Sequence, residues 1–259
     1  MKEIQSICQC HVGCVRSENQ DNYLFNNQNK PSNLQTITIH STVSLHDKTL
    51  SFGVFDGMGG LEQGTLASFA ASEWFLKHTH NVDWFDTHQV LHAYQQCNDF
   101  VHAKLQKTRS EGGSTCALFH IKNNMFSYSN VGDSRLYYIN DQHCNLYTED
   151  HTEANFLYQA NIIDQQQYKS SPKKHVLMQY LGLSKREGLL QPFVQCNLPL
   201  NKGIYLLATD GMHQYFSENQ LISLCQINDI KLMDQQIYNE LILNKANDNF
   251  TYIIIHVKE

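Results

Sequence analysis

Residues 50–60 read LSFGVFDGMGG: an apolar run, Leu50–Phe55, is followed at once by Asp56 and a glycine-rich turn. The run has the length and character of a β-strand whose faces are covered. A strand end is a rigid platform for a side chain, and glycine lets a carbonyl group or a cation approach the backbone closely. This stretch therefore predicts a strand that ends in a functional carboxylate, Asp56.

The same arrangement, an aspartate beside glycine or asparagine next to an apolar run, recurs elsewhere in the chain. The other copies are Asn19-Gln20-Asp21-Asn22, Val131-Gly132-Asp133-Ser134-Arg135, Ala208-Thr209-Asp210-Gly211 and Asn247-Asp248-Asn249-Phe250-Thr251. A single Asp-Gly pair is usually only a turn. Together the copies predict a shared site, provided that the strand ends meet. Carboxylates and carbonyl groups without Cys or His suit hard cations such as Mg²⁺ or Mn²⁺.

Regular elements are predicted around these motifs. The strand-like runs are Gln35–Val43, Leu50–Phe55, Thr115–Ile121, Met125–Val131, Arg135–Ile139, Ile204–Thr209 and Thr251–Val257. Apolar residues at helical spacing predict helices over residues 66–74, 90–105 and 231–243. Ser217 and Gln220 form the S-x-x-Q pattern of a capping box, so a further helix is expected to begin there.

The order of these elements favours an α+β sandwich with helices outside, because strands and helices are segregated along the chain. The short turns between Thr115 and Ile139 predict an antiparallel meander of three strands. The polar segment His151–Leu183, rich in Gln and Lys, is predicted to be an excursion from the core. No linker or repeat divides the sequence, so we expect one domain over residues 1–259.

Composition argues against several classes of protein. Of the 259 residues 41% are hydrophobic, enough for a sizeable core, and the net charge of -6 argues against nucleic-acid binding. The sequence shows no signal peptide and no run of eighteen apolar residues, so we expect a cytoplasmic protein without a membrane span. The eight cysteines contain no C-x-x-C pair, and Cys8-x-Cys10-His11 has no matching second half. Idle thiols are therefore expected rather than a zinc site.

Seven short motifs follow one another from residue 13 to residue 251. They are Gly13-x-x-Arg16-x-x-Asn19-Gln20-Asp21, Asp56-Gly57-Met58-Gly59-Gly60, Gly113-Ser114-Thr115, Gly132-Asp133-Ser134-Arg135, Asp150-His151-Thr152, Asp210-Gly211 and Asp248-Asn249-x-Thr251. Their order resembles that of the PP2C family of metal-dependent protein phosphatases. Ile162-Ile163-Asp164 and Ser171-Pro172-Lys173-Lys174-His175-Val176-Leu177 are similar to its bacterial branch. The resemblance implies a four-layer αββα sandwich, two central antiparallel β-sheets flanked by helices, with residues 151–183 as a flap beside the active site.

The resemblance also implies an activity: hydrolysis of phosphoserine and phosphothreonine by direct attack of a metal-bridging hydroxide. It implies two or three Mn²⁺ or Mg²⁺ ions. Asp56 would bridge two of them, Gly57 would contribute its backbone carbonyl, and Asp210 and Asp248 would complete the ligands of one ion. Two ions about 3.5–4 Å apart can lower the pKa of a shared water and stabilise an in-line displacement.

Further residues receive roles through the same resemblance. Asp21 would lie near the ions and hold their waters. Asp133 would share an additional, weaker ion with Asp210, although a turn aspartate bound to backbone amides is an open alternative. Arg16 would grip two phosphate oxygens with its planar guanidinium group. Supporting roles fall to Asn249 and Thr251 beside Asp248, and to Thr115 and His151 as turn caps.

The chain departs from the family pattern at two positions. Animal members carry a histidine, taken as the general acid, where this chain has Met58. A thioether cannot donate a proton, so the leaving alkoxide must be protonated by another group, such as a metal-bound water. Bacterial relatives commonly have Met at this position, so activity is still expected. They often have His where this chain has Leu61, and the effect on rate or substrate preference is left open.

Two other functions stay open at this point. The fold could serve as a catalytically weak or inactive regulatory protein, but the chain keeps all the predicted metal carboxylates. It could also hydrolyse a small phosphorylated molecule, although no P-loop or adenine-reading motif is present. For the leading function, the expected partners are phosphorylated proteins, which are targets of a Ser/Thr kinase or the kinase itself.

Overall fold

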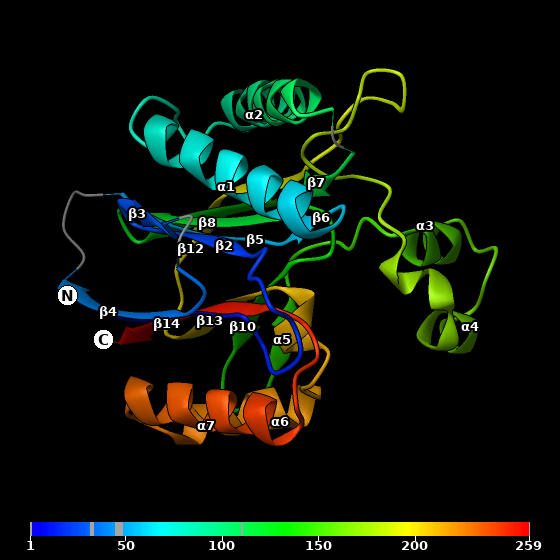
Figure 1. Ribbon diagram of the computed structural model, residues 1–259. Coiled ribbons are helices and arrows are strands. Elements are labelled where there is room, and N and C mark those ends of the chain that lie inside the picture. Colours follow the sequence, from blue (N-terminus) through cyan, green and yellow to red (C-terminus); the bar gives the residue numbers. More distant parts are fainter. Residues whose placement is uncertain (1, 32–33, 45–48, 110, 259) are drawn as a thin grey trace.

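The computed structural model describes residues 2–31, 34–44, 49–109 and 111–258. Two six-stranded sheets lie face to face with helices on both outer sides (Figure 1). Each strand pairing among the described residues is antiparallel. The chain is therefore a four-layer αββα sandwich, which confirms the fold class that the sequence predicts.

The chain passes several times from one sheet to the other. The first sheet has the order β11 (Cys144–Leu146), β10 (Arg135–Ile139), β13 (Gly203–Ala208), β14 (Phe250–Lys258), β1 (Glu3–His11) and β4 (Ile37–Ser44). The second has the order β12 (Phe193–Pro199), β9 (Met125–Val131), β8 (Cys116–Lys122), β5 (Leu50–Phe55), β2 (Asn22–Phe25) and β3 (Gln28–Asn29). A short ribbon of β6 (Gly57–Met58) and β7 (Gly113–Ser114) continues from the end of β5.

Helices cover the outer face of each sheet. The second sheet is covered by α1 (Leu61–His78) and α2 (Thr87–Lys107). The first is covered by α7 (Ile230–Leu243), with α6 (Glu218–Ser223) and the 3₁₀ turn η2 (Leu224–Gln226) beside it. Among the described residues, each helix is too short or too polar to cross a bilayer.

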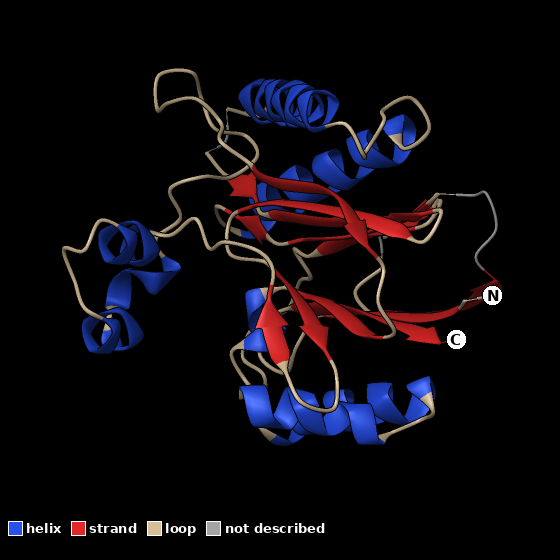
Figure 2. Cartoon of the chain, turned by 180° about the vertical axis from the view of Figure 1, so that it is seen from behind, coloured by secondary structure: helices blue, strands red, loops and turns tan. Residues whose placement is uncertain are grey.

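Two groups of short helices lie closer to the ends of the strands. The helix α5 (Asp210–His213) follows β13 directly. In the segment 151–183, called the flap below, α3 (Glu153–Gln159), α4 (Gln165–Ser170) and the 3₁₀ turn η1 (Pro172–His175) project from one side of the sandwich (Figure 2).

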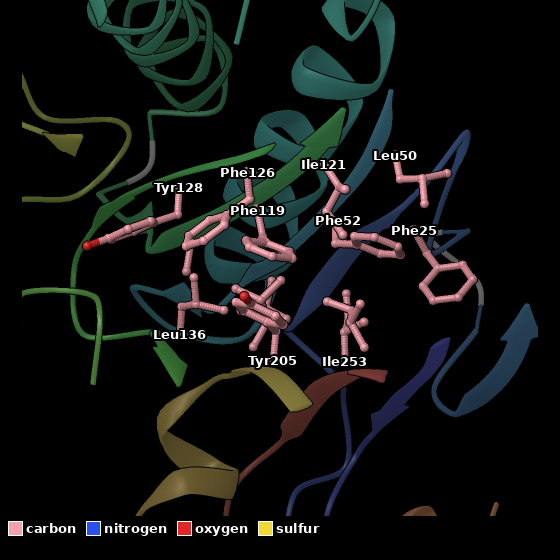
Figure 3. Packing of buried hydrophobic residues seen from close by; sticks show 14 of the residues in the cluster. Phe25, Leu50, Phe52, Phe119, Ile121, Phe126, Tyr128, Leu136, Tyr205 and Ile253 are labelled. Atoms are coloured by element: carbon pink, nitrogen blue, oxygen red, sulfur yellow. The ribbon is translucent and has the colours of Figure 1, made fainter. Parts of the chain in front are cut away.

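The main core fills the space between the sheets (Figure 3). Successive side chains of a strand point to opposite faces, so Phe52 and Val54 of β5 enter this core. Phe55 points the other way and packs with the helices α1 and α2. The aromatic rings of Phe119 and Tyr205, from opposite sheets, stack with centroids 4.9 Å apart. The central strands, such as β5 and β13, are buried on both faces, which fixes the positions of their ends.

One predicted feature is wrong. The strands 115–121 and 125–131 do pair as β8 and β9, but β10 joins the other sheet, so residues 115–139 are not a three-strand meander. The crossing occurs at Gly132, whose φ of +90° favours glycine. A Cβ atom there would lie 2.6 Å from Cγ2 of Thr115, so glycine is also required by space. This tight crossing leaves Asp133 at the end of the sandwich.

Other elements agree with the sequence or extend it. The predicted strands 50–55, 125–131 and 135–139 have the predicted bounds. The capping box of Ser217 and Gln220 is present at the start of α6. The strands β1, β2 and β12 were not among the predicted elements.

Candidate active site

A pocket of about 380 Å³ opens at one end of the sandwich. The ends of β5 and β13, the crossing between β9 and β10, the loops before β2 and β14, and the flap all contribute to its walls. The predicted site residues that line it are Arg16, Asp56, Gly57, Asp133, Asp210 and Asp248. Acids that are far apart in the sequence thus face one space, because the strand ends meet there.

Asp56 is fixed by the backbone around it. Its N–H donates to the hydroxyl of Thr115 at 3.0 Å, and its carbonyl accepts from the N–H of Thr115 at 2.9 Å. Gly57 follows, in a position where a Cβ atom would lie 2.2 Å from the carbonyl oxygen of Gly64 in α1. The turn after β5 therefore allows no larger residue, and it presents Asp56 at the floor of the pocket.

The carboxyl groups of Asp56 and Asp210 are close enough for each to shift the pKa of the other. Burial raises the pKa of Asp56 well above its usual range, and the charges of Asp21, Asp210 and Asp133 raise it further. Burial also raises the pKa of Asp210. These groups resist ionisation together, since each negative charge is both desolvated and close to another.

Asp133 lies in the crossing between the sheets. Burial, followed by the charges of Asp210 and Asp150, raises its pKa to about 8. The ring of His213 in α5 donates to the backbone carbonyl of Asp133 over 3.1 Å. Arg135 holds Asp150 with two hydrogen bonds, 3.0 Å from Nε to Oδ1 and 2.6 Å from Nη2 to Oδ2. The crossing is thus braced on both sides of Asp133.

Asp21 lies behind the pocket wall and is only 1% exposed. Burial raises its pKa to about 7, while the hydroxyl of Thr209, which donates to its Oδ2 over 2.9 Å, acts in the opposite direction. Thr251 belongs to this buried group: its N–H donates to Thr209 Oγ1 and its hydroxyl to the buried Sγ of Cys10. Thr251 therefore contacts the surroundings of Asp21, not Asp248 as the sequence suggested.

Arg16 and Asp248 form the exposed rim. Their side chains are 52% and 38% exposed and make an ion pair of 2.8 Å. Asn249 ties the loop before β14 to the loop between β1 and β2. Its side chain donates to the carbonyls of Val12 and Glu18 and accepts from the N–H of Gln20. The guanidinium of Arg16 is also close enough to sense the charges of Asp56 and Asp210. An exposed cationic group therefore stands at the entrance to the acidic pocket.

A family model described as protein phosphatase 2C matches residues 13–156, more than half of the chain. The chain belongs to this family. Membership confirms the resemblance seen in the motifs and makes the protein a serine/threonine phosphoprotein phosphatase.

Individual relatives are bacterial phosphatases. The protein phosphatase PhpP of Streptococcus pneumoniae is 27% identical over 220 residues, which cover 79% of this chain and 84% of that protein. The serine/threonine phosphatase stp of Listeria innocua is 23% identical over 265 residues, which cover 94% of this chain and 92% of that protein. The structure of Stp1 from Staphylococcus aureus superposes with a TM-score of 0.81 at 21% identity, covering 98% of this chain and 95% of that one.

The pocket of this phosphatase fits the divalent cations on which the family depends. Its acids are buried or partly buried, repel one another and offer only oxygen ligands, the donors that Mg²⁺ and Mn²⁺ prefer. Across the described residues, no three His, Cys, Asp or Glu side chains are already gathered closely enough to enclose an ion. Asp56 and Asp210 instead form a neighbouring pair of carboxyl groups. Cations would remove this mutual repulsion without moving the strand ends.

Sequence reasoning gave little weight to some residues of the site. Thr209 stands in the quoted Ala-Thr-Asp-Gly motif, yet its hydrogen bond to Asp21 joins the end of β13 in the first sheet to the start of β2 in the second. Thr115 was expected to cap a turn, and it braces the backbone of Asp56. His175 lies in the flap motif and lines the pocket, a position that no spacing in the sequence indicates. The side chain of Leu61 lies outside the described part of the structure.

Proposed function

We propose that this phosphatase hydrolyses phosphoserine and phosphothreonine with two divalent cations, Mg²⁺ or Mn²⁺. Asp56, Asp210, Asp248 and the carbonyl of Gly57 would hold the pair. The observation that carries the proposal is the set of partly buried, mutually repelling carboxyl groups that faces one pocket with a guanidinium group at its rim.

The cations, when bound, would lower the pKa of an attacking water and neutralise the charge that develops on the phosphate. Arg16 would leave Asp248 and grip two phosphate oxygens, since a guanidinium group can bind them in a planar fork. Asp21, behind the wall, would orient water molecules near the cations. Asp133 and Asp210 would provide the place for a third, weaker ion.

We also propose an arrangement of the whole chain. Residues 1–259 would form one phosphatase domain, with the flap 151–183 beside the entrance to the pocket. The substrates would be phosphorylated proteins, including targets of a Ser/Thr kinase or the kinase itself, in the cytoplasm. The names of the relatives, protein phosphatase and serine/threonine phosphatase, support phosphoproteins as the substrate class.

The test is phosphate release from a phosphoserine peptide with Mn²⁺, with Mg²⁺ and after chelation. We expect turnover only with a cation, and a loss on the order of 10³-fold in Asp210→Asn, which removes a ligand charge. Asp141→Asn makes the same chemical change at an exposed residue outside the pocket and should leave turnover unchanged. Full activity after chelation, or in Asp210→Asn, would overturn the proposal.

A further inference from the structure

Hydrolysis of a serine phosphate produces an alkoxide, a poor leaving group that needs a proton. Met58 lines the pocket and has no proton to give. Arg16 stays charged at any ordinary pH, so it is a poor proton donor. The hydroxyl of Thr115 already contacts Asp56 and, at 2.6 Å, Ser134. Among the described residues that line this pocket, His175 is the one imidazole.

His175 is exposed at the end of η1, and the backbone on both sides of it is held in place. On one side, Ser171 caps η1 through the N–H of Lys173. On the other, the carbonyl of Val176 accepts from Glu153 over 2.9 Å, and Leu177 forms a β-bridge with Thr152. This part of the flap is therefore anchored beside η1.

The anchor continues to the metal-facing end of the sandwich. His151 stands next to Thr152, and its N–H donates to the carbonyl of Gly132 over 3.0 Å. In return, the N–H of Gly132 donates to Nδ1 of His151 over 3.2 Å. Because Gly132 directly precedes Asp133, the position of His175 is tied to the position of the catalytic acids.

The electrostatic surroundings of His175 also place it inside the site. Its charge reaches Asp210 and His213 of α5. It also borders a neighbouring pocket of about 220 Å³, where Asp133 and Arg135 face it from the crossing and β10. From the flap itself and the adjoining loop, Tyr168, Lys174 and Asp150 line the same space. His175 thus lies between the acids of the first pocket and a group of mixed charges in the second.

We propose that His175 is a catalytic residue that donates a proton to the serine or threonine oxygen as the phosphate leaves. This assignment rests on the proposed function. A water that has released one proton to solvent supplies hydroxide, which forms a bond to phosphorus, and the bond between phosphorus and the seryl oxygen breaks. The seryl oxygen keeps the electron pair and takes the N–H proton of the His175 imidazolium. The products are the free hydroxyl group, hydrogen phosphate and a neutral imidazole, which regains its proton from solvent.

The test compares two substrates that differ in their need for that proton. One is a phosphoserine peptide, whose alkoxide leaves poorly, and the other is p-nitrophenyl phosphate, whose leaving group is stabilised without protonation. In His175→Gln, we expect kcat for the peptide to fall about 100-fold, as is typical for loss of a general acid. For p-nitrophenyl phosphate, kcat should fall by less than about 3-fold, because little of its rate depends on proton donation. The Mn²⁺ concentration for half-maximal activity should stay unchanged, since His175 holds no cation.

The matched control is His80→Gln, which removes an exposed histidine just beyond the C-terminal end of α1. The 18 residues of α1 separate it from the pocket residue Gly60. Both kcat values should equal those of the parent. Because His175 is exposed, His175→Gln should also unfold at the parent's temperature.

Three outcomes decide the matter. A selective loss on the peptide supports His175 as the proton donor. An equal loss on both substrates, or no loss on either, overturns that role while leaving the proposed phosphatase function standing. If the parent protein itself shows no cation-dependent turnover of either substrate, the proposed function fails, and the role of His175 fails with it.

Discussion

The pocket and the inter-sheet core are built on the same strands, yet their buried groups are in opposite situations. The strand β5 sends Phe52 and Val54 into an apolar core and, one residue after its end, presents Asp56. Similarly, β13 carries Tyr205 and Leu207 in the core and leads to Asp210. Core side chains are stabilised by burial, whereas burial raises the pKa of both acids. The rigid core thus holds charges together at a place where they would otherwise separate.

Of the substitutions that distinguish the pocket from the inter-sheet core, Asp56→Asn should give the largest effect. Turnover of a phosphoserine peptide should fall on the order of 10³-fold, because a charge that holds the cations is lost. The free energy of unfolding without cations should not decrease, because the same change removes a partly buried carboxyl that repels its neighbours. Peptide turnover and urea unfolding in a chelator measure the two quantities. A variant that keeps its activity, or loses it only because it unfolds, would contradict this separation.

Phe119→Ala should show the reverse behaviour. Phe119 is fully buried between the sheets and stacks on Tyr205, so its loss leaves a cavity that costs about 3–5 kcal/mol of unfolding free energy. Turnover per folded molecule, measured at low temperature, should stay close to the parent value because Phe119 does not line the pocket. Phe156→Ala, at a flap residue that is 58% exposed, is the control and should change stability by at most about 0.5 kcal/mol. Equal destabilisation by both variants would refute the role given to the core.

The part of the site predicted from the sequence is the part set by the local pattern. Asp56, Asp133 and Asp210 each stand beside a strand whose apolar run is visible in the sequence, so their approximate positions could be inferred. Their convergence was an assumption, since it depends on which strands pair. The crossing of β10 into the other sheet shows the limit: short turns predicted a local meander, and the long-range pairing with β13 prevailed.

The elements that the sequence did not predict are held in place by contacts with distant parts of the chain. In β1, the polar residues Ser6 and Gln9 are buried between β14 and β4, so its sequence lacks a clear apolar face. The flap gives a second case. The place of His175 in the pocket depends on hydrogen bonds from residues 151–153 to residues 176–178, and these leave no periodic signal in the sequence.

His120 provides a titratable group on the core side and a smaller, pH-dependent effect. It is buried, its ring stacks on Trp84, and burial lowers its pKa to about 3. The unfolded chain binds a proton at about pH 6.5, so stability is lost as the pH falls through the range from 6.5 to 3. This group alone contributes a slope of up to about 1.4 kcal/mol per pH unit. We expect His120→Gln to reduce the slope of unfolding free energy between pH 6 and 5 by about this amount.

The slope is a sharper measure than the stability itself, because His120→Gln also changes packing and the hydrogen bond to Ser51. His80→Gln, at an exposed position, should leave the slope unchanged. If His120→Gln and the parent lose stability equally between pH 6 and 5, His120 is not held neutral by burial. Another histidine whose pKa is lowered by burial, such as His213, would then be the better explanation of acid sensitivity.

Ser217→Ala should give the smallest effect, and it tests whether the outer helical layer influences the pocket. The hydroxyl of Ser217 accepts from the N–H of Gln220, and the Gln220 side chain returns to the N–H of Ser217, which closes the capping box of α6. Loss of the cap should cost about 1 kcal/mol of unfolding free energy. Neither residue lines the pocket, so kcat and the Mn²⁺ requirement should not change.

Ser223→Ala, at the other end of α6, is the control, because its hydroxyl bonds a carbonyl within the helix and caps no N–H. If Ser217→Ala lowered kcat without destabilising the protein, the outer helical layer would take part in catalysis, and the rigid strands alone would not account for the geometry of the site.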